Sequence, residues 1–381
     1  TMTADSNLDA DGLFMMGADA EFEAENITIS GFDVIADMLT ADIAADGSGD
    51  IAVTAANNAT FNDAVQAGLV DGTITLEATA GDLTTNLGAT LLAGGNIGTV
   101  SGDDSTFADT VTSINDGIAI SAGGDVTTLA GAALSAIDTD GIGTAGTVLV
   151  EADGSVSLGA DVTGSDGVTV TAGNNIAIGG NIIADFDGGD DGDALITADS
   201  DASGAGNVTM GADFAVTADD ITVTGYNVQI DRLVADWQGA FPGGNAMDTN
   251  GNITIFATNN ADVTDTLTAG TSATSDIDIT AVEGMMTQAA GADMTAGHDV
   301  TIAGGQGIEL GGTIGEAIAI GNDVTLTSAE GTISIGDNIT ADENITATAE
   351  ESILIPGTTI RADADSDNSG DITMTADSNL D

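Results

Sequence analysis

The residues best suited to chemistry lie in short loops where Asp or Asn alternates with small residues. Asn7, Asp9, Asp11 and Gly12 form N-L-D-A-D-G. This pattern resembles the opening of an EF-hand calcium loop, in which oxygen ligands alternate and Gly permits the sharp turn. The twelfth loop position, where a bidentate Glu is expected, falls at Ala18. We therefore predict an irregular calcium site.

Three further loops repeat this pattern. The candidate calcium ligands in them are Asp185 and Asp187, then Asp199 and Asp201, then Asp363, Asp365 and Asp367. The chain has 50 Asp against 12 Glu, and a surface adapted only to salt is expected to use more Glu, so the bias favours Ca²⁺ as a cofactor. The alternative is that Asp, Asn and Gly simply make good exposed turns.

The charge balance restricts the partners. There are 62 acidic residues, and Arg232 and Arg361 are the only basic ones apart from a single histidine, which gives a formal charge of −60. Nucleic acid and anionic membrane surfaces require cationic contacts, so neither is expected as a partner. No apolar run is long enough for a transmembrane helix, so we expect no membrane insertion. With no cysteine, no disulfide contributes to stability.

Catalytic constellations are not evident. His298 is the only histidine and aligns with Gly95 of the other half of the chain, which indicates a surface substitution. With one histidine and no cysteine, the sequence offers neither a zinc site of the usual composition nor a Ser-His-Asp set. We predict that the protein is not an enzyme.

One segment is a candidate contact surface. Tyr226 and Trp237 are the only Tyr and Trp, and Phe241 lies with Trp237 in an insertion, WQGAFPGG, that the first half lacks. Aromatic residues often anchor interfaces, so we predict an interface at Tyr226, Trp237 and Phe241. The alternative is a loop that folds back on its own turn.

The elements that must position these residues are short strands. Openings such as DVTLTS (from Asp323) and NITATA (from Asn344) recur about every 24 residues and alternate apolar with polar side chains. We predict an all-β fold, a parallel β-solenoid with three short strands per turn, as in a right-handed three-sided β-helix. Val324 and Ile345 should stack inward, with Thr325 outward. The alternative is an array of antiparallel β-sandwiches.

A long period contains these turns. Residues 1–9, TMTADSNLD, return as residues 373–381, so we expect a segment of a tandem array with a 372-residue period. The period is itself duplicated, with halves at 1–194 and 195–372, and 373–381 opens the next period. About 26 extra residues between Gly98 and Gly146 should form one additional turn.

The repeats suggest a functional class. Runs such as DGSVSLGADVTGSDGVTVTAGNNIAIGG (residues 153–180) resemble the repeats of filamentous-haemagglutinin-type adhesins, secreted right-handed β-helices of bacterial surfaces. The resemblance implies an extracellular or cell-surface location. We expect a non-enzymatic structural protein that self-associates into a fibre, sheath or filament and binds calcium. The alternative is the stalk of a giant secreted adhesin whose binding domain lies elsewhere.

Overall fold

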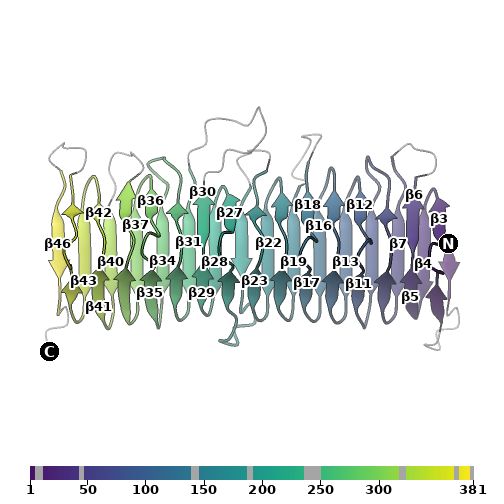
Figure 1. Ribbon diagram of the computed structural model, residues 1–381, viewed down its shortest axis with the longest axis horizontal. Helices are drawn as coiled ribbons and strands as arrows, with labels where there is room; N and C mark the ends of the chain where they lie inside the picture. The colour runs from purple at the N-terminus through teal and green to yellow at the C-terminus, as the bar shows by residue number, and fades with distance from the viewer. Residues whose placement is uncertain are drawn as a thin grey trace. The chain divides into compact units, whose positions relative to one another are not determined.

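The computed structural model describes residues 1–4, 12–42, 47–138, 146–186, 192–235, 250–316, 323–363 and 369–377. All regular elements within these ranges are β-strands. Over the same ranges, no helix is long and apolar enough to cross a membrane. The chain divides into two compact units, Thr1–Gly192 and Asp193–Asp381. In each unit the chain visits three parallel sheets in succession, with roughly 24 residues per turn, so the predicted β-solenoid is confirmed (Figure 1).

In the N-terminal unit, the sheets are numbered in the order in which the chain enters them. The first sheet contains β1 (Met2–Thr3), β4 (Ile27–Gly31), β7 (Ile51–Ala55), β10 (Ile74–Ala78), β13 (Ile97–Ser101), β16 (Ile118–Ala122), β19 (Val148–Ala152) and β22 (Val168–Ala172). The second contains β2 (Leu13–Met15), β5 (Asp33–Ala36), β8 (Ala59–Phe61), β11 (Leu83–Thr85), β14 (Ser105–Phe107), β17 (Val126–Thr128), β20 (Val156–Leu158) and β23 (Ile176–Ile178). The third contains β3 (Glu21–Ala24), β6 (Met38–Ala41), β9 (Val65–Gln66), β12 (Leu91–Ala93), β15 (Val111–Ser113), β18 (Leu134–Ala136), β21 (Val162–Gly164) and β24 (Ile182–Ile183).

The C-terminal unit has the same three-sheet plan. Its first sheet contains β25 (Ala194–Thr197), β28 (Ile221–Gly225), β31 (Ile253–Ala257), β34 (Ile277–Ala281), β37 (Val300–Gly304), β40 (Val324–Ser328), β43 (Ile345–Ala349) and β46 (Ile372–Thr375). Its second contains β26 (Val208–Met210), β29 (Val228–Ile230), β32 (Ala261–Val263), β35 (Met285–Gln288), β38 (Gly307–Leu310), β41 (Thr332–Ile335) and β44 (Ile353–Leu354). Its third contains β27 (Ala215–Ala218), β30 (Arg232–Ala235), β33 (Leu267–Thr268), β36 (Met294–Ala296), β39 (Ile314–Glu316), β42 (Ile339–Thr340) and β45 (Ile360–Arg361).

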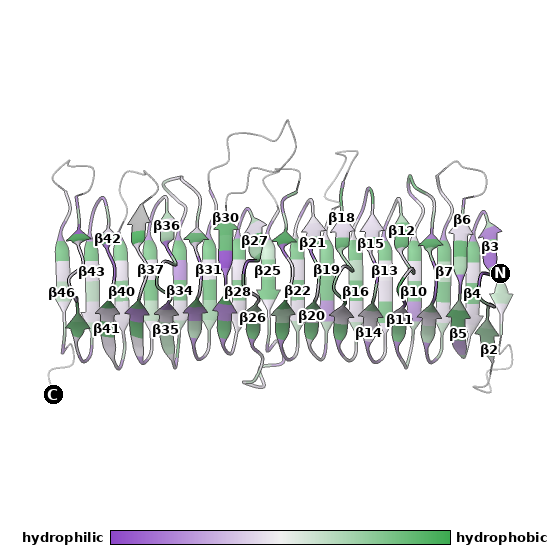
Figure 2. Ribbon diagram, viewed as in Figure 1, coloured by the Kyte–Doolittle hydropathy of each residue, from purple (hydrophilic) through white to green (hydrophobic). Residues whose placement is uncertain are grey.

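Strand register places like residues on top of one another. Ile27 lies opposite Ile51, Ile51 opposite Ile74, and Ile74 opposite Ile97, and all four side chains are buried. Because side chains alternate between the two faces of a strand, every second residue enters the core. Figure 2 shows this alternation as hydrophobic and hydrophilic bands along the strands of each unit. The interior of each unit is therefore made of aliphatic columns.

The stacking predicted for the C-terminal unit is confirmed. Val324 lies opposite Ile345, and their side chains are 1% and 0% exposed. Thr325 lies opposite Thr346, and both are only partly buried. The β-sandwich alternative is wrong, because the strand pairs resolved within the described parts of each unit are parallel.

Large and small residues alternate along one interior column of the N-terminal unit. In its second sheet, Phe61 lies opposite Thr85, Thr85 opposite Phe107, and Phe107 opposite Thr128. All four residues are at most 2% exposed. The threonines leave volume for the two rings. The hydroxyl oxygen of Thr85 accepts a hydrogen bond from the N–H of Ala108 (3.3 Å), and that of Thr128 accepts one from the N–H of Gly159 (3.0 Å). Close packing and hydrogen-bond satisfaction are thus met together.

The predicted additional turn is present. Among the described residues, the first half of the period holds eight strands of the first sheet (β1 to β22) and the second half holds seven (β25 to β43), so the first half has one more turn. The insertion keeps the cross-section because β16 pairs in parallel with both β13 and β19. A solenoid accepts such an insertion by growing in length alone.

Candidate metal centre and the ladders that build it

Asp and Asn side chains form hydrogen-bonded ladders at the corners between sheets. In the C-terminal unit, the side chain of the residue just before a strand of the first sheet accepts a hydrogen bond from the backbone N–H of its counterpart in the next turn. The side-chain oxygen of Asn252 accepts from Asp276 (2.9 Å), that of Asp276 from Asp299 (3.0 Å), and that of Asp299 from Asp323 (2.9 Å). Asp323 continues the ladder by accepting from Asn344 at 2.9 Å.

The same device occurs at the other corners. Before strands of the second sheet in the N-terminal unit, Asp104 donates its N–H to Asp82 (3.2 Å) and accepts from Asp125 (2.8 Å). Before strands of the third sheet, Asp161 accepts from Asn181 at 2.8 Å. Each ladder side chain thus acts as an acceptor for a corner N–H group of the following turn.

This geometry explains why Asp and Asn fill the corners. Their carbonyl oxygen lies one bond beyond Cγ, close enough to the backbone to reach the N–H one strand spacing away, about 4.8 Å. The side chain of Glu is one methylene longer and holds its oxygens further from the backbone. The excess of 50 Asp over 12 Glu therefore has a structural cause in the ladders, independent of any ion. The Asp excess alone therefore does not indicate calcium.

Of the predicted calcium loops, the one at Asp199 and Asp201 is described most fully. One carboxylate oxygen of Asp199 accepts the hydroxyl of Ser203 and the N–H of Gly204, each at 2.9 Å, and Asp201 accepts the N–H of Ser203 at 3.0 Å. Burial acts to raise the pKa of Asp199, but the hydrogen bonds from Ser203, Gly204 and Ala205 outweigh it and lower the pKa. Asp199 and Ala202 have φ of 59° and 56°, in the left-handed region. Hydrogen-bond donors of the loop itself therefore bind the carboxylates of Asp199 and Asp201.

The other predicted ligands are only partly described. Asp185 is fully buried, at 0% exposure, so the alternative of an exposed turn does not describe this residue, and its role as a calcium ligand stays a prediction. Asp363 is partly buried and has a φ of 59°. The remaining predicted ligands lie outside the described residues: Asn7, Asp9, Asp11, Asp187, Asp365 and Asp367.

The predicted aromatic interface is also only partly described. Tyr226 is partly buried in the corner between β28 and β29, where its N–H donates to the carbonyl of Gly206 at 2.6 Å. Trp237 and Phe241 follow β30 and lie outside the described residues. The interface stays a prediction.

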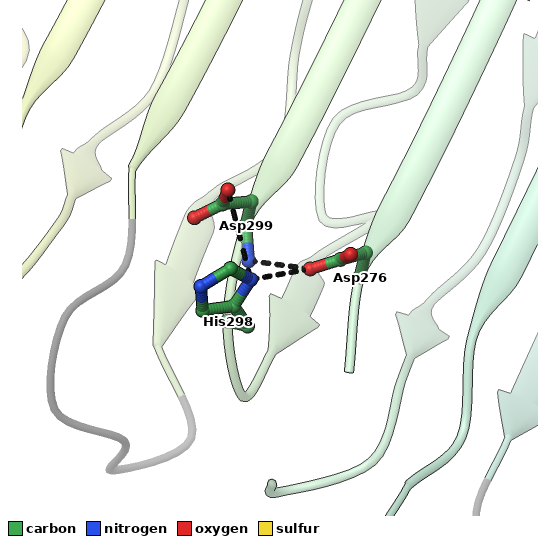
Figure 3. A group of neighbouring side chains, drawn as sticks. All are labelled: Asp276, His298 and Asp299. Carbon is green, nitrogen blue, oxygen red and sulfur yellow. Dashed lines mark hydrogen bonds and ion pairs between the residues drawn. The ribbon is translucent and has the colours of Figure 1, made fainter. Parts of the chain in front are cut away.

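A cluster that the sequence analysis missed surrounds the only histidine. His298 Nδ1 lies 2.7 Å from Asp276 Oδ1 and 3.6 Å from Asp299 Oδ2 (Figure 3). Each of these three residues offers one ligand atom, and the three atoms lie within 4.8 Å of one another. The side chains of His298 and Asp276 are 32% and 38% exposed, so the cluster is open to solvent. We call Asp276, His298 and Asp299 the histidine cluster.

The carboxylates control the charge of His298. Burial acts to lower the pKa of the imidazole, but the hydrogen bond to Asp276 and the negative charges of Asp299, Asp276 and Asp323 outweigh it and raise the pKa. The same negative charges also act on the pKa of the nearby Asp278. Burial and the charges of Asp276 and Asp299 raise its pKa, although a hydrogen bond from Thr301 acts against the rise. The site therefore has an excess of negative charge and favours a cation.

A cleft of about 300 Å³ adjoins the histidine cluster at Asp276. Its polar lining includes Asp220, Asn252, Thr274 and Asp278. A second acidic group, Asp82, Asp103 and Asp104, also brings three carboxylates within 4.8 Å, but all three residues are exposed and the group contains no histidine. The two groups therefore differ in donor type: one mixes nitrogen with oxygen, and the other is all oxygen.

A signal for the histidine cluster is present in the sequence. Asp276 and Asp299 open successive strands of one sheet, so their stacking follows from the period, and His298 directly precedes Asp299. The alignment of His298 with Gly95 compares equivalent positions of the two halves and therefore does not reveal the neighbours of His298 in the adjacent turns. Comparison with family models, with characterised proteins and with solved structures found no match to this chain.

Proposed function

We propose that this chain is a non-enzymatic structural protein of the cell exterior, which self-associates as part of a surface fibre, sheath or filament. Support comes from the internal regularity of each unit, in which the same three-strand turn repeats with the same inward positions. Such stacks bury apolar surface only against their neighbours, so their stability grows with the number of turns. Because stability grows with the number of turns, this architecture suits elongated assemblies.

The observation that carries the proposal concerns the repeated sequence at β1 and β46. Thr1–Thr3 and Thr373–Thr375 are identical, and both segments contribute to a first sheet. Met2 lies opposite Ile29, and Met374 lies opposite Ala347, which are the middle residues of their strands. The repeated segment therefore takes an equivalent place in a first-sheet strand of each unit, which supports the proposal of a tandem array.

Calcium belongs to this proposal as a ligand of the Asp loops. The D-A-D patterns at Asn7–Asp11 and Asp363–Asp367 supply alternating oxygen donors, which calcium prefers. With a formal charge of −60, the chain gains stability from any cation that binds only its folded state. Binding outside the cell, where calcium is abundant, would couple folding to export.

Analysis of surface material from the producing cells tests the proposal. Antibodies raised against residues 250–316 would label intact cells, and the labelled material would be run on a denaturing gel. Short surface-exposed polypeptides that assemble without covalent links into filaments would support the filament. A covalent chain of many periods would support the adhesin stalk. Confinement of the label to the cell interior would overturn the proposal.

A further inference from the structure

We infer that the histidine cluster binds one divalent transition-metal ion of the class that accepts imidazole and carboxylate ligands together, with Zn²⁺ as the representative. The ligands are His298, Asp276 and Asp299, and water completes the coordination. This site is separate from the Asp loops proposed for calcium, and it does not depend on the fibre proposal.

The spacing of the donors fits such an ion. Metal–ligand bonds of about 2.0–2.1 Å place neighbouring donors about 3.0–3.4 Å apart. His298 Nδ1 lies 2.7 Å from Asp276 Oδ1 and 3.6 Å from Asp299 Oδ2, which brackets that range (Figure 3). Small rotations about the side-chain bonds would bring all three donors to one ion. The Nδ1 proton that now bridges to Asp276 would leave as the metal binds.

The ladder holds both carboxylates in position. Asp276 Oδ1 accepts the N–H of Asp299 at 3.0 Å, and Asp299 Oδ1 accepts the N–H of Asp323 at 2.9 Å. These bonds come from the backbone of the following turn, so they fix the orientation of each carboxylate before an ion arrives. Hydrogen bonds of this kind around metal ligands raise affinity because less order is lost on binding.

The imidazole decides which ions the site prefers. Nitrogen ligands suit Zn²⁺, Co²⁺ and Ni²⁺, whereas Ca²⁺ and Mg²⁺ take oxygen ligands almost exclusively. The all-oxygen group of Asp82, Asp103 and Asp104 provides the comparison within the same chain. Both groups are acidic and open to solvent, so charge alone would attract a cation to either. Only the histidine cluster should discriminate in favour of the transition metals.

The surroundings leave room for the rest of the coordination shell. Asp276 lines the cleft of about 300 Å³, which is large enough for several water molecules. Asp278 lines the same cleft, so a further carboxylate lies close to the site.

NMR of the imidazole tests the inference, because the chain has a single histidine. The tag-free chain, uniformly labelled with ¹⁵N, would be titrated with Zn²⁺ at neutral pH while the two imidazole nitrogens are observed. We expect a saturable shift of Nδ1 at one equivalent of Zn²⁺ and no comparable shift with Ca²⁺. An imidazole spectrum unchanged by Zn²⁺, or shifted equally by Ca²⁺, would overturn the inference.

Variants separate the site from the fold. Asp299→Asn keeps an oxygen that can accept the N–H of Asp323 but loses the anionic ligand, so it should weaken Zn²⁺ binding at least tenfold with unchanged circular dichroism. His298→Gly introduces the residue found at the aligned Gly95 and should abolish the tight site, as measured by calorimetry. The matched control, Asp103→Asn, removes one charge from the all-oxygen group and should leave Zn²⁺ affinity within twofold of the unmodified chain. Equal losses in all three variants would show nonspecific charge binding and refute the site.

Discussion

Replacing Asp104 by Asn should stabilise the N-terminal unit, because it removes a charge and keeps a hydrogen bond. The carboxylates of Asp82, Asp103 and Asp104 lie within 4.8 Å of one another. At that separation each like-charge pair costs about 0.9 kcal/mol in water without salt, and about 0.5 kcal/mol when screened over a Debye length of about 8 Å. Two such pairs end at Asp104, so Asp104→Asn should gain about 1 kcal/mol at physiological salt and about 2 kcal/mol at low salt.

The matched variant is Asp104→Glu, which keeps the charge and changes the reach of the side chain. The Oδ1 of Asp104 accepts the N–H of Asp125 at 2.8 Å, and the longer side chain would lose that geometry. The loss of one hydrogen bond costs about 1 kcal/mol, with solvent replacing part of it at this exposed corner. We therefore expect the stability order Asn above Asp above Glu.

Thermal melting at about 10 mM and about 500 mM NaCl measures the charge repulsion. Hydrogen exchange at the Asp125 amide measures the hydrogen bond. The advantage of Asn should shrink at high salt, and faster exchange at Asp125 should appear only in the Glu variant. If Glu protects Asp125 as well as Asp does, the ladder does not require a short side chain and our account of the Asp excess is wrong. A gain for Asn that is independent of salt would refute the electrostatic part.

The Asp loops, His298 and the interior column of Phe107 each provide a further test. If calcium binds the Asp loops, the melting temperature in millimolar calcium should exceed that in EDTA at matched ionic strength, since a hundredfold excess over Kd adds about 2.7 kcal/mol per site; an unmoved melting temperature would show that the loops are ordinary turns. The pKa of His298 is raised in the folded state, so its stabilising interaction with Asp276 and Asp299 is fully present below about pH 6.5, the ordinary pKa of histidine. The interaction is lost as the pH rises through the folded-state pKa. Over this rise in pH, the unmodified chain should lose stability relative to His298→Gly. A constant difference between the two chains from pH 6 to 9 would contradict this sign. Phe107→Ala should cost about 3–5 kcal/mol in chemical denaturation because the ring is fully buried, whereas Thr325→Ala on the outer face should cost under about 1 kcal/mol.

The fold could be predicted because its signal repeats. One alternating strand such as Val324–Ser328 is ambiguous, but the same pattern at a nearly constant spacing identifies a turn, and the stacking of Val324 on Ile345 follows from it. The ladders and the histidine cluster were not predicted. Asp276 and His298 are 22 residues apart. The period places them in neighbouring turns, but their contact also depends on the direction in which a corner side chain leans, which the period does not specify. The calcium loops stay a prediction, because most of their residues lie outside the described part of the chain.

The parallel stacking of turns has a mechanical consequence. Hydrogen bonds between neighbouring turns, such as that from Asp299 to Asp276, run along the direction in which the turns stack. Tension along that direction loads the interfaces in series, so the weakest interface yields first while the others remain intact. A turn of roughly 24 residues that occupies about 4.8 Å when folded releases about 80 Å of extended chain when it peels away. Each unit would thus lengthen in discrete steps and dissipate work under load.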